Sequence, residues 1–543
     1  MAERGGGIGS LSAARLPVHI GSRRNYLPTT PGQDAMRRVA SLAALLLSLA
    51  ACGGGVPSPA GRATLVTNAR IVDGTGTPAR SGSVRIRGDR IVAVGDLRRE
   101  SGDSVVDAHG LTLAPGFIDT HSHHDRGLDK DRGALAVVSQ GVTTIIAGQD
   151  GGSRIPLAGF FAELEANPVA INVASYVGHG SVRDSILGED FKRVATPAEV
   201  ERMKAIVAHE MGAGALGLSS GLEYDPGIYS DPSEVVALAR VAADSGGRYI
   251  SHMRSEDREL FKAADELINI GRVNHMPVQI SHAKLAMRGL WGRAPQFLAK
   301  LDSARASGVD VTMDVYPYPY WQSTLTVLYP SRNFDDRDTT EFILREVAAP
   351  EGLLISRFEP QPEYAGKTVA DIARMRNSDP ATTLMWLIAT SEAARKSGGR
   401  GGQGVIATSM DERDIAKLIA WPFANISSDG ELDGRHPRGF GSFPRVLGRY
   451  IREQHVVSLE EGVCKMTSLA AHNVGLRERG TIAPGMYADL VLFDPATVID
   501  RATPQDPHAL SEGIDRVWVN GTLVYADRAV TGAHPGLVLR RGR

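Results

Sequence analysis

Three histidines follow one short apolar run of the chain. The run APGFIDTHSHHD at 114–125 holds His121, His123 and His124, in a chain with only 15 histidines among 543 residues. His121 and His123 lie two positions apart in an extended segment, so their side chains point to the same side and can bind one ion. His124 points the other way, which indicates a structural role or a role in supporting the metal ligands. A polar loop end is the alternative interpretation.

Two later strand-like runs end in a shared sequence pattern. ISHMR contains His252 and ISHAK contains His282, each with a basic residue two positions further on. One such histidine is more often a core or loop residue. Two of them, together with the first pair, favour a metal site, because imidazole suits zinc and four imidazoles with a bridging carboxylate suit two ions.

An aspartate ends the last strand-like run of the middle region. Asp429 lies in NISSDG, and a Ser-Asp-Gly sequence is also a common turn. A carboxylate at this place can instead accept a proton from metal-bound water and return it to a leaving amine. With the histidines, it indicates hydrolysis.

These residues need a scaffold that brings strand ends together. Apolar or β-branched runs alternate with helical patterns, two of which have N-capping residues at Thr196 and Asp231. The strand-like runs after LAPGFIDTHSHHD are GVTTIIAG, AINVASYVGHG, GALGLSSG, GRYISHMRS, MPVQISHAK, VDVTMDVYPY, QGVIATS and NISSDG. We predict an α/β protein with a (β/α)8 TIM-like barrel, whose chemistry gathers at the carboxyl ends of its strands.

We expect the barrel domain to span residues 116–479. Short β-type runs at 63–115 and 480–543 predict a small β-sandwich domain formed from both chain ends. The stretch around 325–402 is too long for one loop of a barrel and predicts a lid insertion.

Residues 1–52 have the pattern of an extension with a bacterial lipoprotein-type signal peptide. MRRVASLAALLLSLAAC begins at Met36, which competes with Met1 as the start, and it is too short to span a bilayer comfortably. Cys52 would carry the lipid, and 53–62 would form a flexible tether. We therefore expect an exported protein, periplasmic or in the cell envelope, that meets the membrane only through this anchor. A buried apolar helix is the alternative.

Composition limits the partners. The net charge is −2 and the pI about 6.7, so no basic field suggests nucleic acid, and a small-molecule substrate is expected. Besides Cys52 the only thiol is Cys464, which we interpret as a buried packing residue rather than a nucleophile.

The motifs together resemble the amidohydrolase superfamily, and within it the N-acyl-D-amino-acid deacylases (D-aminoacylases), from about Ala63 to the C-terminus. Among them are PGFIDTHSHHD, GALGLSSGLEYDPGIYS, SHMRSE, DVYPY, HPRGFGSFPRVLGRYIRE, MTSLAAHNVGL and RGTIAPGMYADLVLFDP. The resemblance implies a metal-dependent hydrolase that cleaves N-acyl-D-amino acids to a carboxylate and a free D-amino acid by attack of metal-bound hydroxide.

The resemblance also implies residue roles. It implies that His121 and His123 bind the more buried metal ion and that His252 and His282 bind a second ion. Asp429 would be the catalytic base and then the acid. It implies that Arg438, with Lys284 and Tyr224, binds the α-carboxylate of the substrate. It also implies that Tyr316 lines the pocket. A guanidinium does match a carboxylate bidentately. The plain alternative for these side chains is a surface charge or a packed phenol.

One position departs from the family pattern. A metal-ligating cysteine usually stands in a Gly-Asn-Cys-Gly context, whereas this chain has Gly148-Gln149-Asp150-Gly151. A carboxylate can bridge two zinc ions or favour a harder metal such as manganese, so one or two zinc ions, or manganese, are expected with Asp150 as a ligand. The alternative is a simple turn beside a mononuclear site.

Other functions stay open from the sequence. A dipeptidase acting on peptides with a C-terminal D-residue uses the same groups. A cyclic amidase of the hydantoinase kind resembles the same barrel but uses a carboxylated lysine, which GALGLSSGLEYDPG lacks unless Glu223 replaces it. A non-catalytic binding lipoprotein would retain the barrel without turnover.

Overall fold

The computed structural model describes residues 62–542. The predicted signal peptide, the lipid site at Cys52 and nearly all of the tether lie outside these residues. Within the described part, no helix is both long and apolar enough to cross a membrane.

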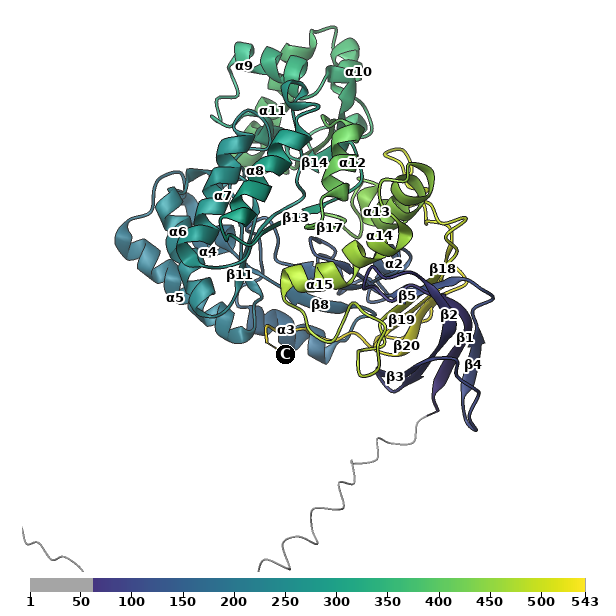
Figure 1. The fold of residues 1–543 in the computed structure, drawn as a ribbon. Coiled ribbons are helices and arrows are strands. Elements are labelled where there is room, and N and C mark those ends of the chain that lie inside the picture. The colour runs from purple at the N-terminus through teal and green to yellow at the C-terminus, as the bar shows by residue number, and fades with distance from the viewer. Residues whose placement is uncertain (1–61, 543) are drawn as a thin grey trace, which may run out of the picture. The chain divides into compact units, whose positions relative to one another are not determined.

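The centre of the fold is a ring of parallel strands, as predicted (Figure 1). Its strands are β6 (Phe117–Asp119), β7 (Val142–Ala147), β8 (Asn172–Ser175), which β9 (Val177–Gly178) continues, β10 (Gly217–Gly221), β11 (Arg248–His252), β12 (Val278–Ile280), β13 (Val311–Val315) and β17 (Ala424–Ile426). The ring closes where the backbone N–H of Asp429 donates to the carbonyl of His121 (2.8 Å) and that of His123 donates to Gly430 (2.9 Å). The first and last strands therefore meet at candidate site residues.

Helices cover the outside of this ring. They are α2 (Leu135–Val138), α3 (Leu157–Ala166), α4 (His179–Leu187), α5 (Pro197–Ala213), α6 (Pro232–Asp244), α7 (Leu260–Asn274), α8 (Ala294–Ala306), α12 (Glu412–Ala420), α13 (Arg438–Arg445), α14 (Leu459–Met466) and α15 (Ser468–Val474). Thr196 caps α5 by accepting from the backbone of Glu199, and Asp231 caps α6, as the sequence predicted. Cys464 in α14 is half-buried rather than buried, and its Sγ lies 3.3 Å from the Ser468 hydroxyl.

Strands from both chain ends form one sheet beside the barrel. They are β1 (Thr64–Ile71), β2 (Arg80–Arg87), β3 (Arg90–Gly95), β4 (Ser104–Asp107), β5 (Thr112–Pro115), β18 (Leu490–Phe493), β19 (Ile514–Val519), β20 (Thr522–Ala526) and β21 (Ala529–Val530). The two ends join where β5 pairs antiparallel with β18, in the order β21-β20-β19-β18-β5-β1-β2-β3, with β4 on β1. The extra domain of both ends is thus present, and the boundaries at 115 and 479 stay predictions.

A buried polar network connects this sheet to the barrel. Asp489 pairs with Arg479 and accepts from the side-chain amide of Asn172 in β8 (3.2 Å). Asn520 donates its backbone N–H to Asp489 (2.8 Å) and its side-chain amide to Asn172 (2.8 Å). Since each buried polar group finds a partner, the network fixes how the barrel and the sheet pack together.

The long stretch between β13 and β17 forms a structure of its own. It contains an antiparallel sheet in the order β14 (Tyr320–Ser323), β16 (Gln403–Thr408), β15 (Leu353–Phe358), with helices α9 (Arg337–Phe342), α10 (Val369–Met375) and α11 (Pro380–Lys396). Figure 1 shows these helices at the opposite end of the described part from β1 to β4.

One strand prediction was wrong. QGVIATS was expected among the barrel strands, but it forms β16, the central strand of the inserted sheet, where Val405 pairs with both Ser323 and Ile355. A central strand is buried on both faces whichever sheet it belongs to, so its apolar run looks the same.

Candidate active site

The carboxyl ends of β6, β7 and β17 bring four candidate ligands together. The ligand atoms of His121, His123, Asp150 and Asp429 lie within 4.8 Å of one another. Asp150 Oδ1 is 3.4 Å from His121 Nε2, and its Oδ2 is 3.3 Å from His123 Nε2. Asp429 Oδ1 is 3.3 Å from the same atom of His123. This set has the donors that a divalent metal such as zinc uses.

A second group shares Asp150 with the first. His252 ends β11 and His282 follows β12, with His252 Nδ1 3.1 Å from His282 Nε2. Asp150 Oδ1 lies 3.3 Å from His282 Nε2. The same carboxylate therefore lies between both histidine pairs, the position in which it can bridge two ions.

Unpartnered atoms show that these residues fit a metal. Both ring nitrogens of His121 and Oδ1 of Asp150 are buried without a hydrogen-bond partner. Buried polar atoms are nearly always satisfied, and a ligand is one explanation of the exceptions. Imidazole nitrogens beside carboxylate oxygens are also the donor set that zinc and manganese accept.

Two imidazoles of the cluster, His123 and His282, favour the charged form, whereas burial lowers the pKa of His252 to about 4. Burial lowers the pKa of His123, but its contacts with Asp150 and Asp429 outweigh this effect and raise the pKa to about 9. Burial and Lys284 lower the pKa of His282, whereas Glu256, Asp150 and Asp429 raise it to about 10. Since the carboxylates stabilise the charged rings, the same carboxylates would stabilise a bound cation.

Two glutamates orient the second histidine pair. Glu223 Oε2 lies 2.9 Å from His252 Nε2, and Glu256 Oε1 lies 3.1 Å from His282 Nδ1. In His282 this ring nitrogen is the one opposite the contact with Asp150, and in His252 it is the one opposite the contact with His282. A carboxylate on the outer ring nitrogen is typical of metal-binding histidines. Glu256 was not among the predicted site residues, although it stands four residues after His252, a spacing that could have indicated this contact.

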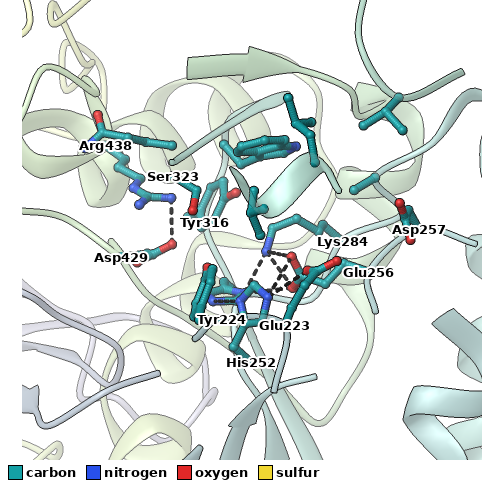
Figure 2. Close-up of a pocket in the computed structure, with 17 residues that line it drawn as sticks. Glu223, Tyr224, His252, Glu256, Asp257, Lys284, Tyr316, Ser323, Asp429 and Arg438 are labelled. Atoms are coloured by element: carbon teal, nitrogen blue, oxygen red, sulfur yellow. Dashed lines mark hydrogen bonds and ion pairs between the residues drawn. The ribbon is translucent and has the colours of Figure 1, made fainter. Parts of the chain in front are cut away.

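Lys284 was expected to contact the α-carboxylate of the substrate, but in the structure it contacts a carboxylate of the chain itself. Its ammonium group donates to both oxygens of Glu256 (2.7 and 2.8 Å) and lies 2.7 Å from His282 Nδ1. Figure 2 shows Lys284 among these groups, with Tyr316 between it and Arg438. The lysine still lines the pocket, but Glu256 already neutralises its charge.

Arg438 contacts the carboxylate expected to move protons. Its Nη1 lies 2.6 Å from Asp429 Oδ2, and Figure 2 shows the pair on the side of the pocket away from Glu256. Burial raises the pKa of Asp429, but Arg438 and His282 hold it well below its usual range, so the carboxylate is charged. The Tyr316 ring centroid is 4.9 Å from the guanidinium carbon, and the Tyr224 ring packs at a tilt against the His252 ring, with centroids 4.2 Å apart. All four predicted substrate-binding residues therefore line one pocket.

The cluster opens outward into a wide polar cleft of about 850 Å³. Its wall combines His123 and Asp150 from the barrel with Arg357 and Glu359 from the inserted segment. The cleft is large enough to admit a small organic molecule to the histidines.

His124 is structural, as its alternation predicted. Its Nδ1 lies 2.8 Å from the Ser122 hydroxyl and its Nε2 lies 3.0 Å from the carbonyl of Gly439. Burial lowers the pKa of His124 to about 4, so the ring is neutral. It connects the β6 loop to α13, which carries Arg438.

Comparison with known proteins identifies the family. The sequence profile of the amidohydrolase family matches residues 104–314 and 366–525, more than half of the chain. The chain belongs to the amidohydrolase family. An N-acyl-D-glutamate deacylase of Alcaligenes xylosoxydans xylosoxydans is 37% identical over 499 residues, 87% of this chain and 95% of that protein. A D-aminoacylase of the same organism is 35% identical over 88% of this chain and 97% of its own length.

A solved structure of this family has the same fold. The N-acyl-D-glutamate deacylase of Bordetella bronchiseptica is 35% identical, with a TM-score of 0.79 over 88% of this chain and 99% of that chain. It was solved with zinc and a phosphonate inhibitor that mimics the tetrahedral intermediate. The predictions of the barrel with its extra domain and of the deacylase family are confirmed.

We expect Asp150→Ala to weaken metal binding more than the roughly 10- to 100-fold typical of an indirect partner, because the variant removes a carboxylate that contacts both histidine pairs. Zinc content and affinity, measured by atomic emission and titration calorimetry, test this. The control is Asp433→Ala, an exposed carboxylate of the same cleft. Unchanged stoichiometry and affinity in Asp150→Ala would exclude Asp150 as a ligand.

Proposed function

We propose that this amidohydrolase removes the acyl group from N-acyl-D-amino acids and releases a free D-amino acid. The observation that carries the proposal is the position of Asp429, which contacts His123 of the candidate metal centre (3.3 Å) and Arg438 of the pocket (2.6 Å). A proton-transferring carboxylate thus lies between the place for a scissile carbonyl and the place for a substrate carboxylate. Relatives named N-acyl-D-glutamate deacylase and D-aminoacylase, at 37% and 35% identity, support the same activity.

The proposed metal is zinc, as one or two ions. His121 and His123 would hold one ion, His252 and His282 the other, and Asp150 would contact both. Manganese is the alternative, because a carboxylate in place of the family's cysteine suits a harder ion. When bound, the ion supplies Lewis acidity toward the amide carbonyl and lowers the pKa of a water molecule toward neutrality.

The chain's own residues would bind the substrate and move the protons. Arg438 would take the α-carboxylate of the substrate through its guanidinium fork, which fixes the register of the amide over the histidines. Tyr316 and Tyr224 exclude water from the sides of the pocket. Asp429, charged and buried, would accept the proton of the attacking water and then deliver it to the departing amine nitrogen. The amide C–N bond breaks as the new carboxylate forms.

We expect Asp429→Asn to bind zinc but to lose at least about 10²-fold in kcat, because an amide of the same shape cannot accept the proton. Release of free D-amino acid measures turnover, and atomic emission on the same sample measures zinc. Near-normal turnover with zinc bound would remove Asp429 from proton transfer.

For Arg438→Met we expect kcat/KM to fall by about 10- to 100-fold on substrates that carry an α-carboxylate, since a charge-assisted bidentate contact is lost. Arg438 also contacts Asp429, so the control is the matching N-acyl amine without a carboxylate, assayed with the same variant. Equal losses on both substrates would show that Arg438 acts only through Asp429.

We also propose that the protein is an exported lipoprotein anchored by Cys52, which the motif MRRVASLAALLLSLAAC supports. The full chain expressed in a bacterial host should partition into the detergent phase and incorporate labelled palmitate, whereas Cys52→Ser should do neither. Cys464→Ser is the matched control, because it changes the only other thiol and should behave like the unaltered chain. A full chain that stays in the aqueous phase and takes up no palmitate label would contradict the lipid anchor.

A further inference from the structure

The inner pocket has an apolar side that the proposed mechanism does not use. It faces the catalytic groups and belongs to the inserted segment between β13 and β17. Its members are Trp321, Val327, Leu328 and Val347. All four are buried, with 4–9% of their surface exposed. The same pocket is lined by His252, His282, Asp429 and Arg438, so whatever fills it lies beside the reacting amide.

The geometry of an N-acyl amino acid decides which part of it enters this space. The α-carbon carries a carboxylate, an acylated nitrogen and a side chain. Under the proposed function, Arg438 holds the carboxylate and the histidine cluster faces the scissile carbonyl. With the acyl group directed to the wide outer cleft, the side chain must turn toward Val327, Leu328 and Val347.

The charges of the pocket disfavour an acidic side chain there. Among the described residues that line it are three carboxylates, Glu256, Asp257 and Asp429, beside Glu223, whose pKa burial raises well above its usual range. Its lysine and its arginine are both paired, Lys284 with Glu256 at 2.7 Å and Arg438 with Asp429 at 2.6 Å, and His282 is paired with Glu256 at 3.1 Å. When the α-carboxylate takes Arg438, a second carboxylate on the substrate finds no unpaired cation. Burying an unpaired charge is costly, and like charges add to that cost.

We infer that this pocket selects D-amino acids with an uncharged, apolar side chain and rejects D-glutamate and D-aspartate. This inference rests on the proposed deacylase function and narrows its substrate class. It separates this chain from the N-acyl-D-glutamate deacylases to which it is 35–37% identical. Leu328 and its apolar neighbours are the specificity-determining residues, and the carboxylates around Lys284 exclude anionic side chains.

The test compares kcat/KM of the zinc-loaded enzyme on N-acetyl-D-leucine, N-acetyl-D-phenylalanine, N-acetyl-D-glutamate and N-acetyl-D-aspartate. We expect the apolar substrates to exceed the acidic ones by about 100-fold or more, because the discrimination comes from an unpaired buried charge. Comparable or higher rates on either acidic substrate would overturn the inference but leave deacylation intact. No turnover on any of the four, with zinc bound, would overturn the proposed function as well.

A single substitution tests whether the apolar side of the pocket faces the substrate side chain. Leu328→Lys places a cation in the apolar side and should shift the glutamate-to-leucine ratio of kcat/KM by about 10-fold or more toward glutamate. Leu328→Met keeps the volume without a charge and should leave the ratio near its starting value. Zinc content and thermal unfolding confirm that both variants are folded. An unchanged ratio in a folded, zinc-bound Leu328→Lys would show that this side of the pocket does not face the substrate side chain.

Discussion

A buried carboxylate between two pairs of imidazoles is the constraint on which the rest of the structure depends. Asp150 lies within 3.4 Å of His121, His123 and His282, and burial of such a charge is costly unless its neighbours compensate. His123 and His282 do so by holding positive charge, and a cation bound between the imidazoles would do so more strongly. The barrel must therefore bring the ends of four strands, β6, β7, β11 and β12, to one point.

The backbone at these strand ends has the conformation that this convergence requires. Asp150, His282 and Asp429 all have left-handed φ values, 54°, 33° and 51°, which non-glycine residues rarely adopt. Gly151 follows at φ 76°, where a Cβ would come within 2.9 Å of the backbone nitrogen of Gly221. Hydrogen bonds that close the barrel hold the same turns, since the N–H of Asp429 donates to His121. The hydrogen bonds that close the barrel therefore also position candidate site residues.

The sequence revealed those features whose signal is local. An apolar run that ends in a histidine marks both a barrel strand and its chemistry, so His121, His252 and His282 could be placed before the structure was known. The apolar run of β16 carried the same local signal, but its sheet is decided by partners far along the chain, and here the prediction failed. The contact of Lys284 with Glu256 was equally hidden, because a basic residue beside a histidine does not show which carboxylate will neutralise it.

The chain assigns reactivity and selectivity to different segments. The histidines and Asp150 belong to the ends of barrel strands, where the ring geometry holds them 3.1 to 3.4 Å from their partners. The apolar side of the pocket belongs to the segment inserted between β13 and β17. The sheet of this segment has its own hydrogen bonds and contributes no strand to the barrel. Val327 and Leu328 can therefore change in size or charge without moving the metal-binding groups. This separation gives a physical reason why relatives that share the barrel and its zinc site can act on different side chains.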